Sequence, residues 1–273
     1  MTDKLAKSLE RLGRTMAERA SAEIIQLPLW QEAKRGTPTS FLRSALFSAI
    51  QSKDREFLKA VTLASQDGIT VKFTGEQLNQ EDLTLWETLV HLAKKHPIGN
   101  ICTFTAHGIL KALNLPTGGH QHRILHEGIT RLIACAVEIT HEGKTYAGSL
   151  VEGSKKDEIT SHYSLRLNRD LIRLYGETQW TAIDWQQRVE LRRKPLAQAL
   201  HGYYSSHRTP YPVKLETLHR LMGSKNAQAA DFKRKCLAAL DQLVSIGFLV
   251  GYSIDRDIVT VQRVTAAALP SGG

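Results

Sequence analysis

The stretch that decides the fold runs from Tyr211 to Val264 and reads YPVKLETLHRLMGSKNAQAADFKRKCLAALDQLVSIGFLVGYSIDRDIVTVQRV. It opens on a short extended run, Tyr211–Leu215, in which Pro212 is typical of an edge or first-strand position. Leucines then recur at helical spacing, and Gly223 and Ser224 are typical of the end of a helix. The first part of the stretch therefore predicts a strand followed by a short helix.

A longer amphipathic helix and a hairpin complete the stretch. The helix is expected over residues Ala227–Ser245, with apolar positions at helical spacing: Phe232, Cys236, Leu240 and Leu243. Two β-rich runs, Phe248–Tyr252 and Ile258–Val261, flank the charged turn Asp255–Asp257, which predicts a hairpin. This order of elements is typical of a winged helix-turn-helix, in which the second helix enters the major groove of DNA and the wing follows the backbone.

The outer face of the second helix carries the side chains that we expect to contact DNA. When the apolar side chains at Phe232, Cys236 and Leu240 face the core, helical geometry turns four others away from it: Asp231, Arg234, Lys235 and Ala238. An ordinary solvated face explains any one of these residues, but the group favours DNA contact. The candidates in this domain are Lys225, Asn226 and Gln228 at the N-terminal end of the helix, Arg234 and Lys235 on it, and Arg256 in the hairpin turn.

The same pattern occurs once more, earlier in the chain. A strand at Ile101–Thr103 leads into a short helix, a turn containing Pro116, and a longer helix over His120–Cys135. The hairpin between Ala136 and Leu150 is interpreted as the wing of this domain. Its candidate DNA-contacting residues are Arg123 and Thr130 on the helix and Lys144 in the hairpin turn.

The predicted fold class is α+β, with two winged helix-turn-helix domains in tandem. We expect a flexible arm over residues 1–40, the first domain over 41–178, the second over 179–264 and a disordered tail over 265–273. A long basic helix, kinked or split at Pro195, is expected over Asp184–Ser205. It adds three candidates for DNA contact: Arg188, Arg192 and Arg193.

Composition agrees with a polyanionic partner. The 273 residues include 36 Lys and Arg against 27 Asp and Glu, a formal net charge of +9, which suits nucleic acid or an anionic membrane surface. The chain has no apolar run of about 18 residues and no signal-peptide pattern, so we expect a cytoplasmic protein with no membrane partner. The three cysteines lie on apolar patterns without metal-ligand spacing, as reduced buried thiols do.

Two partial catalytic motifs fail on inspection. The run Gly148–Lys155 lacks the lysine that a phosphate-binding loop needs directly after its second glycine. His120 and His122, with Tyr203 and Tyr204 as nucleophiles, invite comparison with rolling-circle nicking enzymes. That histidine pair begins a helix, however, whereas a strand would direct both imidazoles to one side of a metal. We therefore expect no catalytic residue, no metal site and no cofactor.

Several longer runs are similar to the TrfA family of plasmid replication initiators: Leu42–Phe47, Asp82–Thr88, Leu132–Ile139, Pro195–Gln198 and His201–His207. The clearest match is PYPVKLETLHRL, residues Pro210–Leu221, and the resemblance covers roughly Gln26 to Arg263. It implies a protein that binds directly repeated sites, called iterons, at a plasmid origin. It also implies that the protein helps to open the neighbouring duplex and recruits the host replicative helicase.

The resemblance further implies contact with the host sliding clamp through a short N-terminal motif. The matching residues are Gln26, Leu27, Leu29 and Trp30, whose apolar side chains suit a partner's pocket. Because Pro28 favours an extended chain and Gly36 and Pro38 are typical of a linker, we expect the motif to be free of the folded core. The alternative is an apolar run that packs at a domain edge.

The resemblance leaves other partners and roles open. Single-stranded origin DNA and a second copy of the chain are further candidate partners, since related initiators switch between a dimer and a DNA-binding monomer. The alternative function is a winged-helix transcriptional repressor whose role ends at operator binding. A nicking relaxase ranks third.

Overall fold

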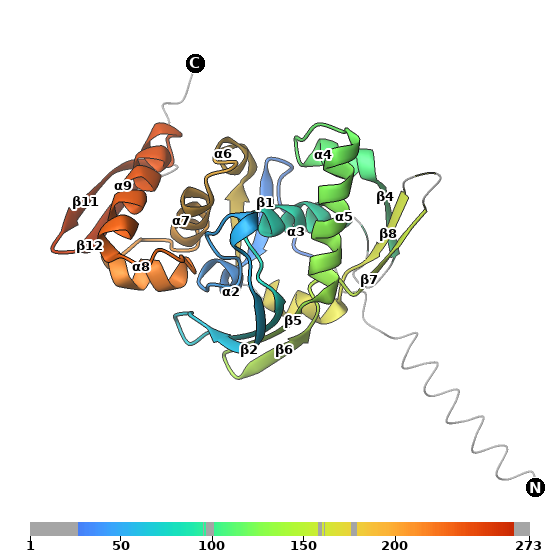
Figure 1. Ribbon diagram of the computed structural model, residues 1–273, viewed down its shortest axis with the longest axis horizontal. Coiled ribbons are helices and arrows are strands. Elements are labelled where there is room, and N and C mark those ends of the chain that lie inside the picture. Colours follow the sequence, from blue (N-terminus) through green and yellow to red (C-terminus); the bar gives the residue numbers. More distant parts are fainter. Residues whose placement is uncertain are drawn as a thin grey trace, which may run out of the picture.

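The computed structural model describes residues 27–94, 96, 101–157, 160, 162–175 and 179–264. These residues form two lobes, seen side by side in Figure 1, each around its own hydrophobic core. The core of the first lobe draws on residues between Leu27 and Ile183, and that of the second on residues between Leu191 and Val261. The predictions for residues 1–26, including Gln26, and for residues 265–273 lie outside the described part of the chain.

The second lobe is the winged helix that its sequence predicts. After α7 (Pro195–Ser205) come β10 (Val213–Lys214), α8 (Leu215–Leu221), α9 (Ala229–Ser245), β11 (Leu249–Asp255) and β12 (Ile258–Arg263). The strand order is β10-β12-β11, and the predicted apolar face of α9 is buried. At the tip of the wing, Arg256 and Asp257 have φ angles of 44° and 65°. Positive φ at both central residues is what a two-residue type I′ hairpin turn requires.

The first lobe contains a second winged helix with the same strand order. Strand β4 (Ile101–Thr105) is followed by α4 (Ala106–Ala112) and α5 (Gly119–Ala134), and the sheet order is β4-β8-β7. The wing is the hairpin of β7 (Gly153–Lys156) and β8 (His162–Arg166). The tandem winged-helix prediction is therefore confirmed, and α5 and α9 occupy the position that a recognition helix has in this fold.

The hairpin predicted as the first wing belongs to another sheet. Strands β5 (Ala136–His141) and β6 (Lys144–Gly148) extend a four-stranded sheet of order β2-β3-β5-β6, together with β2 (Phe57–Leu63) and β3 (Thr70–Glu76). Val137 lies opposite Phe73, and both side chains are buried in the core of the first lobe. Burial of this face draws the hairpin into the larger sheet, so the prediction of a wing at Ala136–Leu150 is wrong.

Helix α3 (Gln80–Ala93) runs through the middle of the first lobe in Figure 1. The Asn79 side chain accepts a hydrogen bond from the Asp82 backbone N–H, and the Asp82 carboxylate accepts one from Asn79 N–H. This reciprocal capping box fixes where the helix begins. Three short helices complete the first lobe: α2 (Thr39–Leu42), η1 (Ser52–Asp54) and η2 (Arg169–Tyr175).

The described part of the predicted flexible arm is folded into the first lobe. Strand β1 (Lys34–Pro38) pairs antiparallel with β9 (Trp180–Asp184), and Leu27 is buried. The expectation of a free arm up to residue 40 is therefore wrong from Leu27 onward. The boundary predicted at residue 179 is also too early, since β9 belongs to the first lobe through this pairing.

Trp30 holds the start of this segment in place. Its side chain is 8% exposed, stacks on Tyr175 at 6.1 Å between ring centroids, and donates a hydrogen bond from Nε1 to His91 Nδ1 at 3.0 Å. A Cβ atom at Gly36 would lie 2.5 Å from the Trp30 ring, so β1 can approach the indole only with glycine there. Trp30 is thus a core residue, whereas Leu29 is 76% exposed.

The predicted basic helix is split into α6 (Trp185–Glu190) and α7, as the proline suggests. Arg193, between the two helices, has a φ of 64°, and Pro195 is the first residue of α7. Arg188 lies on α6, but its side chain is fully buried and forms an ion pair with Glu87 of α3, Nε to Oε2, at 2.8 Å. Helix α6 thereby fastens the second lobe to the first.

We predict that Trp30→Ala lowers the free energy of unfolding by about 3–5 kcal/mol, because it removes a large buried aromatic side chain. Leu29→Ala is the matched control, and the exposure of Leu29 predicts a change within about 0.5 kcal/mol. Urea denaturation of both variants measures the difference. A Trp30→Ala protein as stable as wild type would contradict the burial of the indole.

We also predict that stability falls below about pH 6.5. Burial lowers the pKa of His201 on α7 from 6.5 to about 3, and burial also lowers the pKa values of His91 and His207. The unfolded chain then binds more protons than the folded protein. As the pH falls, each of these histidines therefore lowers the free energy of unfolding by at most about 1.4 kcal/mol per pH unit. Urea denaturation between pH 7 and 5 measures the slope. His201→Gln should flatten it by one proton, and an unchanged slope would contradict the prediction.

Candidate nucleic-acid interface

The outer face of α9 carries the cations that its helical spacing predicts. Arg234 and Lys235 are exposed, and both pair with Asp231 one turn earlier, at 2.7 Å and 3.4 Å respectively. The hydrogen bond from Arg234 lowers the pKa of the Asp231 carboxyl, and the bond from Lys235 adds to this effect. Gln228, directly before the helix, and Arg256, at the wing tip, are also exposed. The structure therefore places these four candidates on the surface of the second winged helix.

The outer face of α5 is weakly basic and rich in histidine. Arg123 is exposed. Its guanidinium donates a hydrogen bond to His120 Nδ1 at 3.1 Å, and its Nε lies 3.8 Å from Glu127 Oε1. Thr130 is exposed, and its hydroxyl donates a hydrogen bond to the backbone oxygen of His126 at 2.9 Å. Both predicted residues of α5 thus lie on its solvent side, as expected of a recognition helix.

The wing of the first lobe adds residues that the sequence reasoning missed. Lys155 on β7 lies opposite Ser164 on β8, and His162 begins β8; Lys155 and His162 are exposed. Helix α5 meets this sheet where the Tyr163 hydroxyl lies 3.3 Å from His126 Nδ1. The two consecutive lysines at the end of β7, Lys155 and Lys156, are the only local sign of this wing, and they do not distinguish it from an ordinary charged hairpin.

Two predicted DNA-contacting residues are used elsewhere, and a third lies in a different sheet from the one expected. Arg188 is fully buried against Glu87 and has no surface to offer a phosphate. Arg192 donates hydrogen bonds to the backbone oxygens of Leu113 and Asn114 after α4, so it connects the lobes. Lys144 begins β6, in the four-stranded sheet rather than in the wing beside α5. These placements correct the prediction for Arg188 and give Arg192 and Lys144 different surroundings from those expected.

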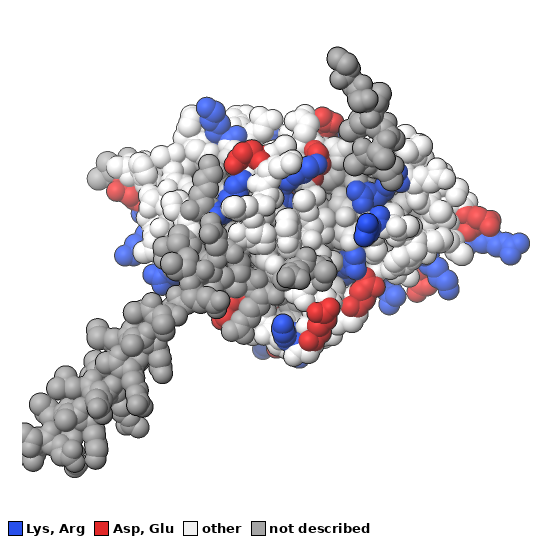
Figure 2. Space-filling model, turned by 180° about the vertical axis from the view of Figure 1, so that it is seen from behind, with Lys and Arg blue, Asp and Glu red and all other residues white. Residues whose placement is uncertain are grey.

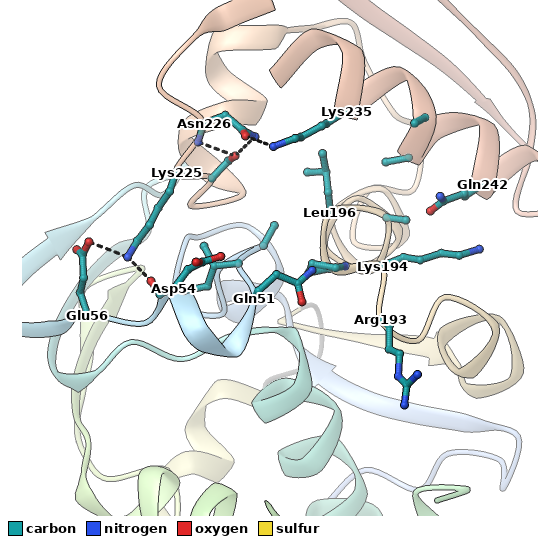
Figure 3. Close-up of a pocket in the computed structure, with 17 residues that line it drawn as sticks. Gln51, Asp54, Glu56, Arg193, Lys194, Leu196, Lys225, Asn226, Lys235 and Gln242 are labelled. Carbon is teal, nitrogen blue, oxygen red and sulfur yellow. Dashed lines mark hydrogen bonds and ion pairs between the residues drawn. The ribbon is translucent and has the colours of Figure 1, made fainter. Parts of the chain in front are cut away.

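A cleft of about 670 Å³ separates α9 from the first lobe (Figure 3). Four cationic side chains line it: Arg193 and Lys194 before α7, Lys225 in the α8–α9 turn, and Lys235 on α9. Two acidic residues of the first lobe, Asp54 and Glu56, line the opposite side. Asn226, another predicted contact, accepts a hydrogen bond from Lys235 here. The cleft thus gathers four of the predicted DNA-contacting residues from three segments.

The reverse side of the molecule is electrostatically mixed. Figure 2 shows Lys and Arg scattered over it, with Asp and Glu among them. The excess of positive charge is therefore not concentrated in one visible patch on this side.

No described helix is long and apolar enough to cross a membrane.

The tyrosines considered as nucleophiles are core residues. Tyr203 and Tyr204 on α7 are each 1% exposed, and burial raises the pKa of both hydroxyls. His120 and His122 lie in the first turn of α5, on a helix as expected. Among the described residues, no group of three or more His, Cys, Asp or Glu side chains could hold a metal ion. The hydroxyls of Tyr203 and Tyr204 are therefore not presented at the surface of this structure.

Comparison with known proteins places the chain in a family. The TrfA protein family model matches residues 8–263. Plasmid replication initiator protein TrfA from Escherichia coli is 28% identical over 243 residues, which span 86% of this chain and 63% of that relative. A crystal structure of domains 2 and 3 of RctB is similar with a TM-score of 0.56 and 12% identity, covering 83% of this chain and 98% of that one.

The crystal structure of Pi initiator protein in complex with iteron DNA is similar with a TM-score of 0.51 and 13% identity. This match covers 73% of the present chain and 100% of the Pi chain. At such identities, the two solved structures support the fold alone, a pair of winged helices. The family match extends over nearly the whole sequence, and this chain therefore belongs to the TrfA family.

Proposed function

We propose that this chain is a plasmid replication initiator that binds iteron DNA through both winged helices. The observation that carries the proposal is the pair of exposed recognition helices, α5 and α9, in a member of the TrfA family. The relative named as a plasmid replication initiator and the Pi structure solved with iteron DNA support the same function. The chain spans about 63% of that relative's length, so the activity of the whole relative is carried over here as a proposal.

The geometry suggests how the work is divided between the two lobes. Helix α9, which exposes Arg234 and Lys235, would supply bidentate and point-charge contacts in one major groove. Helix α5 offers Arg123 and Thr130 to another groove, with Lys155 of its wing toward the backbone. Such contacts require no covalent chemistry, so we propose a protein that acts by binding and not as an enzyme.

Origin opening and helicase recruitment distinguish an initiator from a repressor with the same fold. We propose that the bound protein promotes melting of the neighbouring duplex and recruits the host replicative helicase. Permanganate probing of supercoiled origin DNA detects unpaired thymines next to the iterons when the protein is added. Iteron binding without such reactivity would favour the repressor.

We predict that Arg234→Ala weakens iteron binding by about 1–3 kcal/mol if its guanidinium reads a guanine edge. The loss should be smaller on a scrambled duplex, where phosphate contacts dominate. Fluorescence anisotropy with both duplexes at one salt concentration measures the ratio. Arg220→Ala, on α8, controls for loss of one positive charge. Equal losses on the two duplexes would make Arg234 a phosphate contact.

We also propose that the chain contacts the host sliding clamp, with Leu29 as the anchor that the folded protein exposes. We predict that Leu29→Ala lowers clamp affinity at least about tenfold, as removal of a buried interface anchor does. Iteron affinity and unfolding free energy should remain at wild-type values. Clamp binding by surface plasmon resonance tests this, and an unchanged affinity would contradict recruitment through this motif.

A further inference from the structure

The lysine before the second recognition helix is already paired in the free protein. Lys225, in the turn between α8 and α9, places Nζ 2.8 Å from Glu56 Oε1 and donates to the backbone oxygen of Asp54. Both acceptors belong to the first lobe, on the far side of the cleft in Figure 3. A residue expected to contact DNA is thus held by a carboxylate of the other lobe.

The backbone on either side of this pair is fixed. Ala49 N–H donates to the Met222 backbone oxygen at 2.7 Å, so the turn after α8 rests against the first lobe. At Gly223, a Cβ atom would lie 2.4 Å from Ser48 Oγ, which shows how closely the two segments approach. Lys225 and Glu56 can therefore change partners by side-chain rotation while the lobes stay where they are.

Glu56 pairs with one of the cationic side chains that line the cleft, and the others remain near enough to contact a bound anion. Arg193, Lys194 and Lys235 line it together with Lys225. The side chains of Lys225 and Glu56 are 32% and 66% exposed, and an ion pair in such a position adds little stability. A phosphate oxygen presents the same negative acceptor to an ammonium group as a carboxylate oxygen does. Exchange of one for the other would cost little.

We propose that Glu56 occupies Lys225 in the free protein as an internal substitute for a DNA phosphate, and that the sugar-phosphate backbone of bound DNA replaces it in the cleft. The proposal rests on the DNA-binding function proposed above and assigns the interlobe cleft to the backbone. Glu56 then acts as a built-in competitor that lowers DNA affinity. Lys225 supplies a contact without sequence information, since phosphates are alike along the duplex.

A double-mutant cycle with Glu56→Gln and Lys225→Gln tests the exchange. Glu56→Gln should tighten DNA binding by about two- to fivefold, the range expected for release of an exposed ion pair. Lys225→Gln should weaken binding and lower the slope of log affinity against log salt by about one. In the Lys225→Gln background, Glu56→Gln should have no further effect. Anisotropy titrations on iteron and scrambled duplexes should show the same changes.

The matched control removes a carboxylate from a similar pair away from the cleft. On the four-stranded sheet, Lys72 Nζ lies 3.0 Å from Glu138 Oε1, and the two side chains are 51% and 44% exposed. Glu138→Gln therefore breaks an exposed ion pair with the same change in net charge as Glu56→Gln. If Glu56→Gln binds no tighter than Glu138→Gln, or keeps its effect without Lys225, the proposal is overturned. If wild type does not prefer iteron DNA, the proposed function fails, but the Glu56 effect is still measurable on scrambled DNA.

Discussion

The buried ion pair between Arg188 and Glu87 determines how the two winged helices are joined. Both side chains are fully buried, with Arg188 Nε 2.8 Å from Glu87 Oε2. Burial raises the pKa of Glu87, and the guanidinium opposes that rise, as does the hydrogen bond that Thr37 donates at 2.6 Å. One carboxylate therefore joins α6, α3 and β1. Neither charge can be left alone in this environment without a large desolvation cost.

The connection between the lobes follows from that pair. Arg188 also donates to the Gln80 backbone oxygen at 3.1 Å, at the start of α3, and its own backbone oxygen accepts from Gln198 on α7 at 3.4 Å. Arg192 extends the contact to the end of α4 through two carbonyl groups. Basic residues that seemed suited to DNA thus hold the domains together. Positive charge on a linker helix can serve the protein's own architecture as readily as a polyanion.

The parts of the fold that depend on local sequence could be predicted. Helical spacing around Phe232 and the charged turn at Arg256 were sufficient for α9 and the second wing. The first wing could not be found this way, because its identity rests on the pairing of Cys102 with Leu165, far along the chain. The prediction that Trp30 is free of the core was wrong for the same reason. Its hydrogen-bond partner His91 is 61 residues away, and nothing in the local sequence distinguishes an extended motif that is free from one that is packed.

The close approach of Gly223 to Ser48 bears on the spacing of the DNA sequences that the chain could read. At Gly223, φ is 56°, so a larger residue would be both strained and obstructed by the first lobe. The turn after α8 therefore packs directly against the first lobe, and this contact helps to set how α9 lies relative to α5. On B-DNA, each added base pair turns the next groove by about 34°, given about 10.5 base pairs per turn. A protein that binds DNA through both lobes, as proposed above, would with this joint tolerate base changes between its two contact sites far better than insertions there.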